Sequence, residues 1–185
     1  MIGKLAKALL GRSPKFVEYM ISQWTEELRE NPNDYETWAA LGAAYGKLHR
    51  YEDAVASFKK AIEANPKYAE AYLGLASSYG FLGRSQDKIA ACEQAIELKP
   101  NYAEAYATLG AAYGKVGQYQ DAIRALGEAL RLDPNFHYAQ YTLGVAYLTS
   151  GNTAAAVREA NALDLVDASL GRQLRDLIRE YTNAR

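Results

Sequence analysis

The sequence has few of the residues that make up most catalytic and metal sites. It contains one cysteine, Cys92, and two histidines, His49 and His137. A single cysteine excludes an internal disulfide and a cysteine-rich metal site, and it favours a reducing, cytoplasmic setting. The histidines lie far apart without an acidic partner at a catalytic spacing, and there is no glycine-rich phosphate loop or HExxH motif. We therefore predict no enzyme activity, no metal and no cofactor.

Charge and hydropathy exclude two further classes of protein. Lysine and arginine total 21 residues and aspartate and glutamate 22, which gives a net charge of −1. A nucleic-acid-binding protein needs excess positive charge to displace the counterions of the phosphates, so we expect no nucleic-acid partner. A membrane-spanning helix needs roughly 18 or more consecutive apolar residues, and the sequence has no such run, so we predict no transmembrane segment.

What the sequence has in abundance is an internal repeat. Residues 35–47 recur at 69–81 and at 103–115, a shift of 34 residues each time, and a weaker copy begins at His137. Repetition accounts for most of the tyrosine content, which is 15 residues against 4 phenylalanines and 2 tryptophans. A proline after each apolar stretch separates one repeat from the next, because proline cannot donate a helical hydrogen bond. The prolines with this period are Pro32, Pro66, Pro100 and Pro134.

Within each repeat the apolar residues have helical spacing. In the first repeat Trp38, Leu41 and Tyr45 fall at i, i+3 and i+7, which indicates one face of a helix. A short polar turn at His49 follows, and a second apolar stripe comes after it. Each repeat is therefore predicted to consist of two antiparallel helices. The second stripe of the first repeat is Ala54, Val55, Phe58, Ala61 and Ile62.

This pattern resembles the tetratricopeptide repeat family. Repeats of that family carry an aromatic residue, Leu-Gly, tyrosine, alanine, a second aromatic residue, alanine and proline at fixed positions. The resemblance implies an all-α solenoid of helical hairpins, wound as a right-handed superhelix. The first repeat carries the complete set: Trp38, Leu41, Gly42, Tyr45, Ala54, Phe58, Ala61 and Pro66.

Two of the repeats depart from the family pattern. The second places Lys88 where the small alanine belongs and Cys92 at the bulky position. We expect the stem of Lys88 to pack and its ammonium to reach solvent, with a local loosening of that repeat. Cys92 lies on an apolar helical stripe, so we interpret it as a packed structural thiol. The fourth repeat keeps Leu143, Gly144, Tyr147 and Ala156 of the pattern.

The repeats divide a single domain, residues 1–185, into parts. Residues 1–34 form a degenerate half-repeat, in which the apolar spacing predicts a helix over residues 15–31. Residues 167–182 are predicted to form an amphipathic capping helix with arginines on its outer side. Such caps are expected because a terminal repeat otherwise exposes an apolar face. The full repeats are residues 35–68, 69–102 and 103–136, and the divergent fourth repeat is residues 137–166.

Residues 1–12 have two interpretations. They carry Lys4, Lys7 and Arg12 together with apolar residues that fit one helical face. In the first interpretation they form a degenerate helix that packs on residues 15–31. In the second they are a detachable amphipathic segment that docks on an anionic membrane or in another subunit's groove. We favour the first because the apolar face is short.

The predicted first helices of the first three repeats carry an acidic residue near their start. Asn33 and Asn101 each precede a glutamate by three residues, ahead of an apolar stripe, which is the arrangement of a capping box. We favour capping over a ligand role for these pairs. The glutamates themselves, Glu36, Glu70 and Glu104, nevertheless make one edge of the binding surface acidic.

The resemblance also implies a concave groove lined by the first helix of each repeat. The matching positions lack the asparagine and arginine with which chaperone-binding members clamp a terminal carboxylate, so we expect no such clamp. Gly46, Gly80 and Gly114 share one slot. A helical glycine costs about 1 kcal/mol relative to alanine, so either a ligand uses the bare backbone or duplication copied a harmless residue. The predicted groove residues are Glu36, Ala39, Ala43, Gly46, Lys47, Glu70, Leu73, Ser77, Gly80, Phe81, Glu104, Ala107, Thr108, Ala111, Gly114, Lys115, Tyr138, Tyr141, Thr142, Val145 and Leu148.

The predicted function is non-catalytic binding of a partner protein, in the role of an adaptor or assembly factor. The partner offers an apolar or amphipathic peptide or helix, whose basic residues meet the glutamates. The alternative is a self-assembling scaffold, a homo-oligomer in which an N-terminal segment fills the groove of a neighbouring subunit. The apolar anchors in the groove are predicted to be Phe81, Tyr138, Tyr141 and Leu148.

Overall fold

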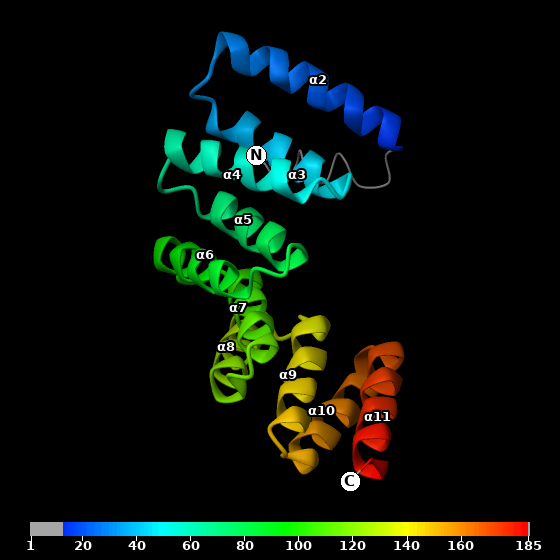
Figure 1. Cartoon of the computed structure of the whole chain (residues 1–185). Coiled ribbons are helices and arrows are strands. Elements are labelled where there is room, and N and C mark those ends of the chain that lie inside the picture. Colours follow the sequence, from blue (N-terminus) through cyan, green and yellow to red (C-terminus); the bar gives the residue numbers. More distant parts are fainter. Residues whose placement is uncertain (1–12, 185) are drawn as a thin grey trace. The chain divides into compact units, whose positions relative to one another are not determined.

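The computed structural model describes residues 13–184, and every regular element in that range is a helix (Figure 1). The all-α fold of helical hairpins predicted from the repeat is confirmed. The interpretations of residues 1–12 fall outside the described residues. The helices are α2 (Pro14–Glu30), α3 (Tyr35–Lys47), α4 (Tyr51–Ala64), α5 (Ala69–Phe81), α6 (Ser85–Leu98), α7 (Ala103–Lys115), α8 (Tyr119–Leu132), α9 (His137–Thr149), α10 (Thr153–Val166) and α11 (Ala168–Asn183).

The chain divides into two compact units, with the division in sequence between Pro100 and Asn101. The first unit contains the hairpins α3–α4 and α5–α6, and α2 packs against α3. The second unit contains the hairpins α7–α8 and α9–α10, and α11 packs against both helices of the last hairpin. Each unit thus consists of two repeats and one additional terminal helix.

A residue in the left-handed conformation lies in the turn of every hairpin. Gly83, Gly117 and Gly151 have φ angles of 75°, 81° and 88°. Glycine adopts this conformation readily because it has no Cβ. The first hairpin has His49 in the same slot, with a φ angle of 60°. A residue with a side chain is therefore held where the later repeats use glycine, at some conformational cost.

The glycines of the Leu-Gly pairs in the first and third repeats let the two helices of a hairpin approach closely. A Cβ on Gly42 would lie 3.0 Å from the ring of Phe58, and one on Gly110 would lie 2.5 Å from Cγ of Leu126. Both separations are shorter than ordinary carbon–carbon contact, so a larger residue fits only if its neighbours move. The small residue Ala54 on the returning helix is fully buried, as the repeat pattern requires.

Cys92 lies in the core of the first unit. Its side chain is fully buried, and burial raises the pKa of the thiol to about 12 despite the opposing effect of the positive charge of Lys88. Such a thiol carries almost no thiolate at neutral pH and is a poor nucleophile. The interpretation of Cys92 as a packed structural residue is confirmed.

The helix predicted over residues 15–31 is present as α2, shifted by one residue at each end. Its start is capped by Ser13, whose Oγ accepts a hydrogen bond of 3.4 Å from the backbone N–H of Phe16. Val17 and Trp24 are buried in a cluster with Ala40 of α3. Helix α2 therefore covers apolar residues of α3.

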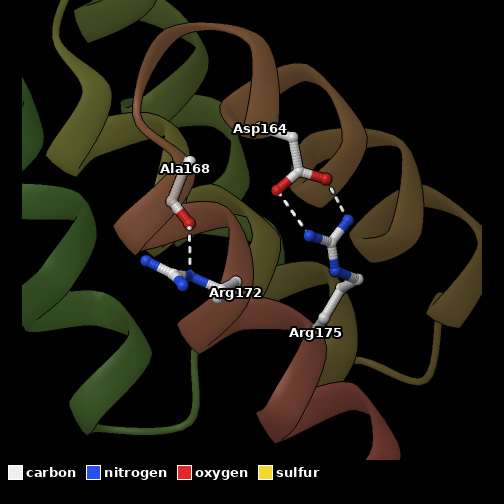
Figure 2. Close-up of polar contacts among 4 residues, drawn as sticks. All are labelled: Asp164, Ala168, Arg172 and Arg175. Atoms are coloured by element: carbon white, nitrogen blue, oxygen red, sulfur yellow. Dashed lines mark hydrogen bonds and ion pairs between the residues drawn. The ribbon is translucent and has the colours of Figure 1, made fainter.

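The terminal helix α11 is held on α10 by an ion pair between two helices (Figure 2). Arg175 binds both carboxylate oxygens of Asp164, one of them at 2.7 Å, and Nε of Arg172 donates to the backbone carbonyl of Ala168 at 3.2 Å. Leu174 is fully buried and contacts α9 where Gly144 leaves the backbone bare. Arg175, one of the arginines predicted on the outer side of this helix, therefore also ties α11 to α10.

The capping-box prediction is wrong. The N-cap of α3 is Asp34 and not Asn33, and Oδ1 of Asp34 accepts hydrogen bonds from the backbone N–H groups of Glu36 at 3.1 Å and Thr37 at 3.2 Å. The N-cap of α7 is Tyr102, whose side chain makes no cap hydrogen bond. A capping residue must stand directly before the first helical residue, so a helix start one residue later takes the asparagines out of position.

Candidate partner-binding surface

The second unit has a pocket between α7 and α9, the first helices of its two hairpins. Its volume is about 230 Å³. Gly114 contributes bare backbone to it, and a Cβ placed there would meet no atom within 4 Å. Small apolar walls with hydroxyl groups and a lysine nearby form a site that can hold one side chain of a partner. The lining residues are Gly110, Ala111, Gly114, Lys115, Tyr119, Thr142, Val145, Ala146 and Thr149.

The pocket gathers several residues that the repeat register placed in the groove. Tyr119 was missed, because only the first helix of each repeat was considered and Tyr119 is the first residue of α8. Tyr51 holds the same position in the first repeat, and this recurrence of tyrosine is the sequence signal that could have identified Tyr119. The predicted residues that line the pocket are Ala111, Gly114, Lys115, Thr142 and Val145.

Two tyrosines form an accessible aromatic pair on the first turns of α9. The ring centroids of Tyr138 and Tyr141 lie 6.2 Å apart with an angle of 26° between the planes. Tyr138 is 63% exposed. Partial burial and, to a smaller extent, the neighbouring Tyr138 raise the pKa of Tyr141 above its usual value. Tyr141 therefore remains neutral at physiological pH, and the two rings offer apolar faces with hydroxyl groups.

Three of the predicted groove residues have little or no accessible side chain. Leu148 is 4% exposed and packs in a cluster with Leu163 and Leu174, so the prediction that it is a partner anchor is wrong. The reason is α11, whose apolar face covers this part of α9. Ala39 is fully buried and Ala107 is 8% exposed.

The first unit exposes an aromatic cluster at the end of α5. Phe81 is 70% exposed, and its ring stacks on Tyr51 of α4 with centroids 4.5 Å apart and planes 7° from parallel. The Nδ1 atom of His49 lies 2.8 Å from the hydroxyl oxygen of Tyr51. The sequence register singled out Phe81 alone, because Tyr51 and His49 lie outside the first helices. Stacking holds the Phe81 ring in place on an otherwise accessible surface.

Lys88 covers Gly80, the glycine of α5 in the slot that Gly46 and Gly114 share. A Cβ on Gly80 would lie 3.2 Å from Cδ and 3.4 Å from Nζ of Lys88. The expectation that the stem of Lys88 packs is confirmed, whereas the expected loosening of the repeat stays a prediction. A Cβ on Gly46 in α3 would meet no atom within 4 Å. The same slot is thus covered in α5 and open in α3.

The three glutamates lie in the first turns of α3, α5 and α7. Negative charge in a first turn interacts favourably with the helix dipole, which gives these residues a structural role as well. Oε1 of Glu70 accepts from Nζ of Lys99 at 3.1 Å, whereas Glu104 is exposed and Glu36 half-buried. The remaining predicted residues are half-buried or exposed: Ala43, Lys47, Leu73, Ser77 and Thr108.

Two hollows flank Trp38 in the first unit and contain none of the predicted groove residues. One, of about 340 Å³, is lined by side chains of α2, α3 and α4, and the other, of about 410 Å³, lies beside Pro32 and Lys60. The indole Nε1 of Trp38 donates to the backbone carbonyl of Pro32 at 2.8 Å. The register gave Trp38 only a packing role, so these hollows had no signal in the sequence.

The described part of the chain contains neither a membrane-spanning helix nor a cluster of metal ligands. Within residues 13–184 no helix is long and apolar enough to cross a bilayer. In the same range no three histidine, cysteine, aspartate or glutamate side chains gather closely enough to hold a metal ion.

Two protein-family models match the sequence, and both are described as tetratricopeptide repeat. One matches residues 35–68 and 103–136, and the other matches residues 57–90. The first covers the hairpins α3–α4 and α7–α8 together with the turns that follow them. No curated protein matches the chain in sequence.

Solved structures with the same fold align over most of the chain. A crystal structure of MamA is 29% identical with a TM-score of 0.72, and the alignment covers 87% of this chain and 90% of that chain. MamA 41-end from Desulfovibrio magneticus RS-1 is 24% identical with a TM-score of 0.76, covering 91% and 94%. YrrB, described as a TPR protein with an unusual peptide-binding site, is 21% identical with a TM-score of 0.75, covering 92% and 88%. The last two likenesses show the fold alone.

Proposed function

We propose that this chain, which belongs to the tetratricopeptide repeat family, is a non-catalytic module that binds a peptide or helix of a partner protein. Helical-repeat arrays generally present extended surfaces for protein interaction, and the fold relative YrrB is described as having a peptide-binding site. We extend the proposal to the role of an adaptor or assembly factor in the cytoplasm.

The observation that carries the proposal is the open space over Gly114. In α9 the corresponding residue, 34 positions later in the sequence, is Leu148, and its side chain is buried among those of α10 and α11. In α7 the same slot has no side chain, and the space belongs to a pocket. A site of this kind gains affinity when a partner places an apolar side chain in it and displaces water.

The ligand that fits this surface is an amphipathic segment. One apolar side chain enters the pocket, and a second contacts the exposed ring of Tyr138. A basic side chain of the same segment meets Glu104 in the first turn of α7, which is exposed. Apolar anchors supply most of the affinity in such complexes, whereas rim charges mainly set orientation and association rate.

The test fills the pocket with a larger side chain of the protein itself. We expect Gly114→Leu to weaken binding by about tenfold or more to an array of synthetic 15-residue amphipathic peptides of Leu, Ala, Lys and Glu, measured by fluorescence polarisation. The helix tolerates leucine here, as Leu148 shows in the equivalent slot. The matched control is Gly127→Leu in α8, an exposed helical glycine with open space around it that does not line the pocket.

Equal loss in both variants, or no loss in either, contradicts the proposed site. Circular dichroism and thermal melting of both variants verify that the helices are retained. Sedimentation of the full chain addresses the alternative scaffold role. A concentration-dependent oligomer that Gly114→Leu dissociates identifies a second copy as the occupant of the pocket.

A further inference from the structure

We propose that Lys88 is a specificity-determining residue that binds a side-chain carboxylate of the partner, in segments that also place an apolar residue against Phe81. The inference rests on the proposed function, because it names the chemistry of a segment that such a module binds. It concerns the first unit alone and is independent of the pocket beside Gly114.

The stem of Lys88 begins at a position that the other repeats bury. The other three repeats have buried alanines in this slot, Ala54, Ala122 and Ala156. An ammonium is costly to remove from water, so a lysine that starts from such a position must extend its stem to a more open place. Gly80 leaves that path open, with Nζ of Lys88 only 3.4 Å from where a Cβ of Gly80 would stand.

An apolar contact surface begins at the next residue. Phe81 follows Gly80 directly at the end of α5, is 70% exposed, and is held by stacking on Tyr51. The ammonium of Lys88 thus lies near Gly80, and the next residue of the same helix carries the aromatic ring. A partner segment that places an apolar side chain on the ring brings its neighbouring side chains close to Lys88.

The arginines at this end of the first unit are compensated within the chain. Nε of Arg84 donates to Asp87 at 2.7 Å, and its guanidinium lies 4.5 Å from the ring centroid of Tyr79. Arg50 pairs with Asp53 at 2.7 Å in the same way. Lys88 adds a further positive charge to this surface. An ammonium has three N–H donors, so contacts within the chain leave capacity for a ligand.

The surroundings of Lys88 favour a carboxylate over other acceptors. Its side chain is half-buried, so an opposite charge is screened less than it would be on open surface. Hydrogen bonds between an ammonium and a carboxylate are also stronger than those between neutral groups. A single lysine does not surround a chain terminus, so the expected ligand group is the side chain of glutamate or aspartate.

The test uses the peptide array in matched pairs, with one glutamate in the first copy and glutamine in the second. The wild-type chain is expected to bind the best glutamate copies about three- to fivefold more tightly than their glutamine partners, with a difference that shrinks as salt is added. Lys88→Ala abolishes this preference, and it folds because alanine stands at this position in the other repeats. Lys88→Arg retains it. Lys59→Ala, which removes an exposed lysine of α4 in the same unit that lines none of the described pockets, is the matched control and leaves it unchanged.

The outcomes separate this inference from the proposed function. Peptide binding without a glutamate preference in the wild type overturns the role of Lys88 and leaves the binding function standing. A preference that survives Lys88→Ala, or that Lys59→Ala removes instead, also overturns it. If no peptide of the array binds, both proposals fail. Phe81→Ala is expected to weaken glutamate and glutamine copies equally, which distinguishes the apolar contact from the charged one.

Discussion

The glycine slot near the end of the first helix differs between the hairpin α5–α6 of the first unit and the hairpin α7–α8 of the second unit. In the second unit the space over Gly114 is open and belongs to a pocket. In the first unit Gly80 lies beneath the stem of Lys88. The two glycines share one position in the repeat, so the difference comes from the second helix of each hairpin. Whether the glycine is covered therefore depends on the residue eight positions later in the chain, which is Lys88 after Gly80 and Ala122 after Gly114.

The comparison extends to glycines within a single helix. Gly110 and Gly114 are one helical turn apart in α7, yet a Cβ on Gly110 would lie 2.5 Å from Leu126, and a Cβ on Gly114 would meet nothing within 4 Å. Gly110 is required by packing between the helices of the hairpin. Gly114 is not required by packing, which leaves its role to a ligand or to the history of duplication.

The largest expected effect tests this contrast in packing. Gly110→Val should lower the free energy of unfolding by about 3 kcal/mol, because the added methyl groups overlap Leu126 and the backbone carbonyl oxygen of Ala122. Urea denaturation followed by circular dichroism measures the change. Gly114→Val is the control and should change the free energy of unfolding by less than about 1 kcal/mol. Similar losses in both variants would mean that the two glycines do not differ in their packing.

A smaller effect compares the covered and open slots directly. Gly114→Ala should raise the free energy of unfolding by about 0.5–1 kcal/mol, because alanine is the better helix former and has room for its Cβ. Gly80→Ala should gain less, because the end of the Lys88 side chain must move by a few tenths of an ångström. Thermal melts of the two variants provide the measurement. A larger gain at Gly80 would show that Lys88 does not occupy the slot in solution.

The smallest effect concerns the one hairpin turn that lacks glycine. His49→Gly should stabilise the first unit by about 0.5 kcal/mol, because it relieves a left-handed φ of 60° while adding freedom to the unfolded chain. Gly117→His in the second unit is the reciprocal variant and should lose a similar amount. Chemical denaturation of the pair measures both changes. Stabilisation by histidine at position 117 would indicate that the contact between His49 and Tyr51 outweighs the backbone strain.

The helices were predictable from the sequence because three signals coincide in the second and third repeats, and two of the three occur in the first and fourth. Apolar stripes at helical spacing, glycine in the turn and proline after the second helix agree on where each helix begins and ends. The bounds of α2 were also predictable, since the expected range of 15–31 differs from Pro14–Glu30 by one residue at each end. The register also placed Gly114 and Val145 on the surfaces that meet in the second-unit pocket.

Other features depended on contacts that the repeat pattern does not encode. Leu148 is buried because α11, which is not a repeat, covers it. Asp34 caps α3 because the helix begins one residue later than the capping-box prediction assumed. The stacking of Phe81 on Tyr51 joins two helices at positions that the groove rule does not consider. Each case needed knowledge of a neighbour outside the repeat unit or a helix start known to a single residue.

The lysine-bearing hairpin α5–α6 has a consequence for engineering. Its turn glycine and the proline that follows it lie within one period of the sequence, so the hairpin can be duplicated as a cassette between its neighbours. Each inserted copy would add another Lys88 equivalent at a regular spacing along the array. A partner with several evenly spaced acidic residues would then gain affinity with every copy, through avidity and without a new kind of contact. The affinity of the array would then increase with the number of carboxylates in its ligand.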